Sequence, residues 1–181
     1  MVKQRKILAV SGSTRQTSTN LNLLQIIALL YKNEIELTIS ESIGTLPQFN
    51  PDDTDAVIPE VTRLREHIRN ADAVLICTPE YAHGVPGALK NAIDWTVSSN
   101  EFSHKPTALI TASTDGRFGH AALLETLRTI EAENIDNLQL LIPFAKTKIG
   151  NDTIKDELTL AAVKKLMGDL LQTIDAMPAA K

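Results

Sequence analysis

The sequence contains little cysteine, few aromatic residues and no long apolar run. Its one cysteine, Cys77, has no partner for an internal disulfide and lies in an apolar segment, which favours a buried and unreactive thiol. No run reaches the roughly 18 apolar residues that a membrane-spanning helix needs, and the N-terminus lacks the pattern of a signal peptide. These absences predict a soluble cytoplasmic protein that does not bind membranes.

An excess of positive charge is also missing. The 181 residues carry a formal net charge of −4, whereas general binders of nucleic acids or membrane surfaces rely on clustered Lys and Arg. The four histidines show no metal-ligand spacing, so we expect no metal site. With 43% hydrophobic and 22% charged residues, the chain is expected to form one globular domain over residues 1–181.

Three common loops of phosphate chemistry are absent. The dinucleotide-binding fingerprint needs three spaced glycines, but the segment after the first apolar run contains only Gly12. No Gly-Lys-Ser or Gly-Lys-Thr follows that run, which excludes a P-loop. Cys77 is not followed by a phosphate-binding arginine, so a cysteine-dependent phosphatase is excluded as well.

Apolar runs alternate with segments of helical periodicity along the chain, which is typical of βαβ units. We predict five strands, over 7–10, 35–39, 73–77, 108–112 and 138–142. We predict five helices, over 20–31, 59–70, 86–98, 119–133 and 154–176. The connection over 40–58 is too long for a simple loop, which indicates a functional or flexible segment.

Periodicity also predicts which helical residues face the core. In the first helix, the residues expected on the buried face are Leu21, Leu24, Ala28 and Tyr31. In the last helix, the residues expected to point inward are Leu158, Ala162, Leu166, Leu170 and Ile174.

The strands differ in their apolar patterns, and this difference predicts their order. The first, third and fourth strands are apolar on both faces, as central parallel strands are. The second strand alternates strictly and the fifth carries Gln139, so both are expected at the edges. The prediction is an α/β fold with a flavodoxin-like, doubly wound, five-stranded parallel sheet in the order 2-1-3-4-5. Its ligand is expected where the first and third strands lie side by side.

The loop after the first strand has the composition of an anion-binding site. Ser18 is a suitable N-cap, and Leu21 stands where a capping box would place an acid, so no local carboxylate competes for the helix amides. Arg15 and five neighbouring hydroxyl side chains add donors to that positive helix end. This pattern suits a phosphate monoester, although an ordinary polar loop with a cap has a similar composition.

The loop after the third strand leaves from the same edge of the predicted sheet. Gly84 and Gly87 allow the backbone to approach a ligand closely. The amides of Ala82, His83 and Gly84 could then face a planar ring that forms hydrogen bonds, with Tyr81 packed against it.

The two loops together carry a family pattern. GSTRQTSTN followed by PEYAHGVPGALKNAIDW resembles the NAD(P)H-dependent FMN reductase family, which includes quinone, azo-compound and chromate reductases. The resemblance implies bound FMN, NAD(P)H as co-substrate and no catalytic side chain. It also implies hydride transfer to a quinone, an azo compound, a metal oxyanion or a free flavin, in a homodimer or homotetramer.

The same resemblance assigns site residues. The FMN phosphate is expected to bind Ser13, Arg15, Ser18, Thr19 and Asn20. The isoalloxazine is expected to lie against Pro79, Glu80, Tyr81 and Ala82, near the amides of His83 and Gly84, with Ser113 of a third loop beside the ring. Arg15 is expected to be the only full positive charge at the phosphate. Independently of the resemblance, the place of Arg117 in the third loop predicts that it binds the 2′-phosphate of NADPH.

Two other functions remain open. A non-catalytic electron carrier like flavodoxin usually stacks its flavin between aromatic side chains and carries a strong negative charge. The 4% aromatic content and the net charge of −4 favour a reductase over such a carrier. An FMN-binding redox sensor is compatible with the same residues.

Overall fold

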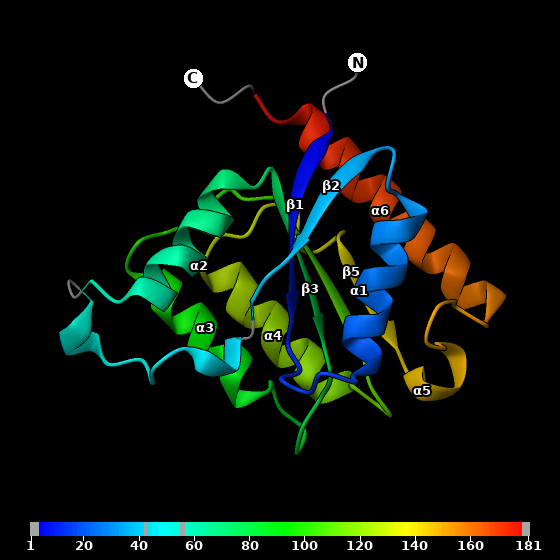
Figure 1. Ribbon diagram of the computed structural model, residues 1–181, viewed down its shortest axis with the longest axis horizontal. Helices are drawn as coiled ribbons and strands as arrows, with labels where there is room; N and C mark the ends of the chain where they lie inside the picture. Colours follow the sequence, from blue (N-terminus) through cyan, green and yellow to red (C-terminus); the bar gives the residue numbers. More distant parts are fainter. Residues whose placement is uncertain (1–3, 42, 55–56, 179–181) are drawn as a thin grey trace.

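The computed structural model describes residues 4–41, 43–54 and 57–178, and it contains one five-stranded parallel sheet. The strand order is β2-β1-β3-β4-β5, so the predicted flavodoxin-like fold is confirmed (Figure 1). The strands are β1 (Arg5–Ser11), β2 (Ile35–Ile39), β3 (Ala73–Thr78), β4 (Thr107–Ala112) and β5 (Gln139–Ile142).

Helices cover both faces of the sheet. They are α1 (Thr19–Leu30), α2 (Pro59–Asn70), α3 (Gly87–Val97), α4 (Arg117–Thr129), α5 (Ala145–Lys148) and α6 (Glu157–Ala176). Helices α1 and α6 lie on one face, and α2, α3 and α4 lie on the other (Figure 1). Within the described residues, none of these helices has the length and apolar character needed to cross a lipid bilayer.

Alternating residues of the central strands build two cores. Ile7 and Ala9 of β1 face the cluster formed with α1 and α6, whereas Leu8 and Val10 face the cluster formed with α2, α3 and α4. Every residue of β3 and β4 is buried, as expected for strands covered on both faces. The sheet is therefore a rigid base for the loops at its carboxyl edge.

The predicted buried faces of two helices are partly wrong. In α1 the residues buried against the sheet include Leu23, Leu24 and Ile27, while Leu21 is only partly buried because it lies at the margin of this face. The last helix begins at Glu157 rather than at residue 154, because Asp156 caps it by accepting from the amide of Thr159 at 2.8 Å.

Leu158 is the second residue of α6 and is 81% exposed, so its predicted burial is wrong. Val163, Leu166 and Leu170 carry the buried face of α6.

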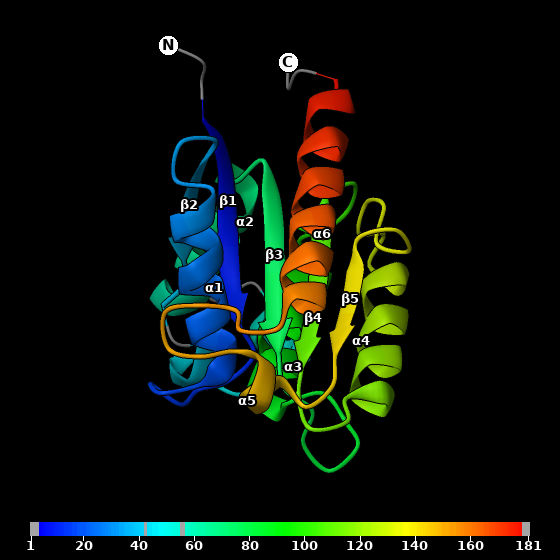
Figure 2. The ribbon, with the colours of Figure 1, turned by 90° about the vertical axis from the view of Figure 1, so that its right-hand side faces the viewer.

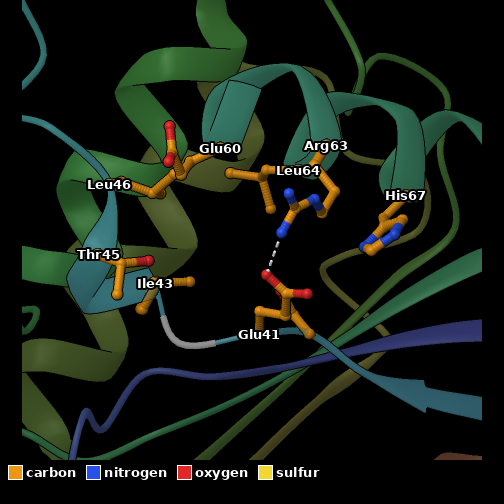
Figure 3. A pocket seen from close by; sticks show the side chains of 9 residues that line it. Glu41, Ile43, Thr45, Leu46, Glu60, Arg63, Leu64 and His67 are labelled. Atoms are coloured by element: carbon orange, nitrogen blue, oxygen red, sulfur yellow. Dashed lines mark hydrogen bonds and ion pairs between the residues drawn. The ribbon is translucent and has the colours of Figure 1, made fainter. Parts of the chain in front are cut away.

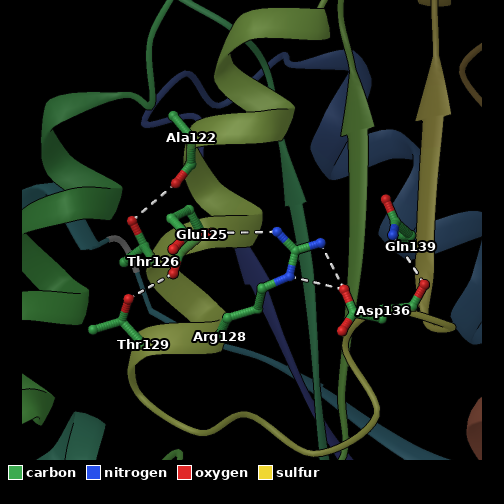
Figure 4. A network of polar contacts seen from close by, with 7 residues as sticks. All are labelled: Ala122, Glu125, Thr126, Arg128, Thr129, Asp136 and Gln139. Atoms are coloured by element: carbon green, nitrogen blue, oxygen red, sulfur yellow. Dashed lines mark hydrogen bonds and ion pairs between the residues drawn. The ribbon is translucent and has the colours of Figure 1, made fainter.

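The segment between α4 and β5 is held by a polar network. Arg128 donates from Nε and Nη2 to Asp136 Oδ1 at 2.8 and 2.6 Å (Figure 4). Gln139 at the start of β5 donates to the backbone oxygen of Asp136 at 2.9 Å. The helix predicted to reach residue 133 ends at Thr129, and turns lead from it into β5.

The long connection over 40–58 packs against α3. Asn91 accepts from the amide of Phe49 at 2.7 Å and donates to the Pro47 oxygen at 2.9 Å. Trp95 is 1% exposed, donates to the same oxygen at 2.9 Å and contacts the Phe49 ring edge-on. These bonds hold the described part of the loop in place; residues 42 and 55–56 lie outside the described residues.

A second contact joins this connection to α2. Arg63 pairs with Glu41 at 2.6 Å across a small cavity, which Ile43 and Leu64 also line (Figure 3). The cavity measures about 20 Å³. It has room for about one water molecule, so it does not hold a cofactor.

Candidate functional site

A cleft of about 340 Å³ opens at the carboxyl edge of the sheet. The loops after β1, β3, β4 and β5 contribute its walls, and Figure 2 shows these loops gathered at the end where the strand arrows point. The residues that line it are Ser13, Arg15, Thr17, Ser18, Thr19, Asn20, Pro79, Glu80, Tyr81, Ala112, Ser113, Thr114, Ala145 and Lys146. Nine of the twelve residues predicted for the site are therefore brought together here.

The start of α1 forms one end of the cleft. Ser18 is 5% exposed, and its Oγ accepts from the amide of Leu21 at 3.0 Å, so the predicted N-cap is confirmed. The first turn of α1 carries no acidic residue. The positive end of this helix therefore faces the cleft without a carboxylate of its own.

The loop between β1 and α1 is pressed against β3. The amide of Gly12 donates to the Cys77 oxygen at 2.8 Å, and a Cβ on Gly12 would lie 2.2 Å from Thr78 Oγ1. Beyond it, Ser13 Oγ accepts from the Arg15 amide at 3.3 Å. Only glycine fits at position 12, and this close approach sets the position of the residues that follow.

The Asn20 side chain forms hydrogen bonds within the wall of the cleft. Its side chain is buried and donates to the Ala112 oxygen at 3.2 Å, while the Cys77 thiol donates to Asn20 Oδ1 at 3.2 Å. The amide thus joins the ends of β3 and β4 to α1. Burial of Cys77 raises the pKa of its thiol, which agrees with the predicted unreactive cysteine.

The loop after β3 forms a tight hairpin. Tyr81 and Gly84 exchange backbone hydrogen bonds of 3.1 and 2.9 Å. Ala82 and His83 have φ of 48° and 57°, as in a type I′ turn. The His83 ring stacks on Phe118 of α4, with centroids 4.5 Å apart. Tyr81 lines the cleft, whereas Ala82, His83 and Gly84 do not, and the Gly84 amide is used within the turn.

Glu80 joins this hairpin to α4. Its Oε1 accepts from the Gly116 amide at 3.3 Å and its Oε2 from the Gly119 amide at 2.5 Å. Its own amide donates to Ser113 Oγ at 3.2 Å. A Cβ on Gly119 would lie 2.9 Å from the Gly84 oxygen, so glycine is needed for this approach. The Glu80 carboxylate therefore occupies the positive end of α4.

Lys146 lines the cleft from α5 and is not among the residues predicted for the site. Arg15 is therefore not the only cation in the cleft. The sequence does contain a signal for Lys146, because two lysines stand in Ala145–Lys148, shortly after β5. The carboxyl ends of parallel strands share one edge of the sheet, so a lysine placed there can reach the ligand site. Arg117 lies outside the cleft lining and pairs with Asp115 through bonds of 2.8 and 3.0 Å.

Known proteins share this sequence and fold. The NADPH-dependent FMN reductase family matches residues 5–146. An NAD(P)H-dependent FMN reductase from Pseudomonas aeruginosa is 38% identical over 148 residues, covering 78% of this chain and 79% of the relative. A quinone reductase from Pseudomonas putida is 41% identical over 112 residues, covering 59% of each chain.

The chain spans less than two thirds of the length of several curated relatives, this quinone reductase among them. Among solved structures, the flavoenzyme NAD(P)H:(acceptor) oxidoreductase FerB from Paracoccus denitrificans superposes with a TM-score of 0.72. It is 28% identical, and the match covers 94% of this chain and 96% of FerB. The chain belongs to the NADPH-dependent FMN reductase family, a family of oxidoreductases with FMN as cofactor and NAD(P)H as co-substrate.

Proposed function

We propose that this protein binds FMN in the cleft, takes hydride from NAD(P)H and reduces a small acceptor in the cytoplasm. The acceptor classes are quinones, azo compounds, free flavins and metal oxyanions. The observation that carries the proposal is the cleft itself, in which the capped start of α1, Arg15 and several hydroxyl groups meet at the carboxyl edge of the sheet.

The donor set fits the phosphate group of FMN. A phosphate monoester carries about −1.5 to −2 charges near neutral pH and accepts several hydrogen bonds. Ser13, Arg15 and Thr19 line the cleft beside the start of α1, whose free amides favour an anion. We assign the phosphate to this end, with Ser18 as the cap that keeps the first turn in place.

The ring end of the cleft is formed by Pro79, Tyr81 and Ser113. Tyr81 is 51% exposed, so its ring is available to pack against a flat ligand. The chemistry that bound FMN supplies is hydride acceptance from NAD(P)H and electron delivery to the acceptor. The residues of the chain would hold the ring in place and would leave one face open for the nucleotide and the acceptor in turn.

Two measurements test this proposal. Purified protein loaded with FMN should be yellow, and addition of NADPH without oxygen should remove the absorbance near 450 nm. Steady-state turnover with NADPH and a quinone should give the parallel-line pattern of a ping-pong mechanism. Bleaching without turnover on any acceptor class would indicate an electron carrier or a sensor, and absence of FMN binding would contradict the proposal.

We also propose that the protein assembles as a homodimer or homotetramer. A groove of about 710 Å³ between α3 and α4 supports an interface on this face, because its mixed polar and apolar lining includes Ile93, Ile130 and the half-exposed Val97. Light scattering after gel filtration tests the assembly. A monomeric mass at micromolar concentration would contradict it.

A further inference from the structure

We propose that Lys146 is a second cationic contact for the phosphate group of FMN, in addition to Arg15. The inference rests on the proposed function, because it assigns a residue to the phosphate end of the same cofactor site. Three observations support it: the position of α5, the hydrogen bonds that hold α5 in place, and the charges of the residues that line the cleft.

Two backbone hydrogen bonds fix the position of α5. The amide of Phe144 donates to the Thr114 oxygen at 3.0 Å, and the amide of Ala145 donates to the Ser113 oxygen at 3.0 Å. Ala145 is 2% exposed and packs in the core on the α6 side of the sheet. The backbone next to Lys146 is therefore attached to the loop that follows β4.

This position lies at the phosphate end of the cleft. Figures 1 and 2 both show α5 beside the N-terminal end of α1, although more than a hundred residues separate the two helices. Lys146 lines the same cleft as Arg15, Ser18 and Thr19. An anion bound at the start of α1 would thus share its cleft with one cation from each of two segments that are distant in the sequence.

The charges that line the cleft do not cancel. Among the described residues, neither Arg15 nor Lys146 forms an ion pair. The one acidic residue of the lining is Glu80, and both its carboxylate oxygens accept from amides of α4. Arg15 and Lys146 are both exposed, so water screens their mutual repulsion in the free protein, and a bound dianion would attract both.

A matched variant pair tests this inference. Lys146→Gln removes the charge and keeps most of the side-chain length. Lys148→Gln makes the same change two residues later in α5, at a side chain that does not line the cleft. Both variants have the same net charge, so long-range electrostatics is controlled.

Apoprotein is titrated with FMN and, separately, with riboflavin, which lacks the phosphate, and quenching of flavin fluorescence reports affinity. We expect Lys146→Gln to raise the Kd for FMN about five- to tenfold, as for one charge-assisted contact. Riboflavin affinity should be unchanged, Lys148→Gln should match the wild type, and Lys146→Arg should restore most of the FMN affinity.

The other outcomes overturn the inference in distinguishable ways. If wild type and Lys146→Gln bind FMN equally, Lys146 does not contact the phosphate, and the proposed function stands. Equal losses of FMN and riboflavin affinity in Lys146→Gln would indicate a distorted cleft instead of a lost charge. If wild-type apoprotein binds neither flavin, the proposed function fails and this inference fails with it.

Discussion

Glu80 is the residue whose role differs most from its sequence-based assignment. Its place in the family pattern predicts a wall for the flavin ring, and it does line the cleft. Its carboxylate, however, accepts from the amides of Gly116 and Gly119 and so caps α4. The sequence could not show this, because the contact joins segments about 36 to 39 residues apart through a turn whose geometry depends on Ala82 and His83.

Glu80→Gln tests this cap. An amide side chain offers one neutral acceptor where the carboxylate offers two charged ones, so the apoprotein should lose about 1–2 kcal/mol of unfolding free energy. Urea denaturation measures the loss. Glu125→Gln changes an exposed side chain of α4, the helix that Glu80 caps, and serves as the control. It should lower the free energy of unfolding by less than about 0.5 kcal/mol. Equal stability of the two variants would show that the Glu80 cap contributes little.

At the scale of elements, caps and apolar patterns in the sequence predict those helices and strands that short segments of the chain determine. The N-cap Ser18 predicts the start of α1, and the structure confirms it. The apolar runs of β3 and β4 and the alternation in β2 predict the order of the sheet, which is confirmed as well. Helix α5 was missed because four residues carry no periodicity, and its entry through Phe144 at φ 55° depends on contacts with the loop after β4. Tertiary bonds determine such an element, so sequence reasoning could not predict it.

His120 links three elements and gives stability a pH dependence. It is 8% exposed in α4 and lies 2.8 Å from Thr111 Oγ1 of β4 and 3.0 Å from Gln139 Oε1 of β5. Burial lowers the pKa of His120, and the bond to Gln139 only partly opposes this shift. The unfolded chain binds the His120 proton more tightly than the folded chain does. The contribution of His120 to the free energy of unfolding is therefore complete above about pH 6.5, and it is lost as the pH falls from there toward the folded pKa.

Measurements of the unfolding free energy between pH 7.5 and pH 5 test the direction of this pH dependence. The wild type should lose stability on acidification more steeply than His120→Gln, which cannot take up the proton. A steeper loss in His120→Gln than in wild type would contradict the assignment.

At the scale of the whole molecule, the parallel sheet brings the residues of the cleft together. Four loops that are far apart in the sequence meet at one edge because all five strands are parallel. The two cores hold that edge in place from both faces of the sheet. The cleft is therefore largely formed before a ligand binds, and ligand binding should stabilise the whole fold.

FMN should raise the thermal stability of the apoprotein by mass action. A ligand that binds only the folded state adds about 2.7 kcal/mol when its free concentration is 100 times its Kd. We expect the melting temperature to rise steadily with FMN concentration and to rise less with riboflavin at equal concentration. A melting temperature that does not change up to millimolar FMN would mean that the fold has no FMN site.

The most direct measurement compares FMN and riboflavin binding to wild-type apoprotein and to Arg15→Ala. If the start of α1 and Arg15 hold the phosphate, wild type binds FMN far more tightly than riboflavin. Arg15→Ala should then raise the Kd for FMN about tenfold or more without changing riboflavin affinity or unfolding the chain. Equal wild-type affinity for the two flavins, or full FMN affinity in Arg15→Ala, would contradict the phosphate site.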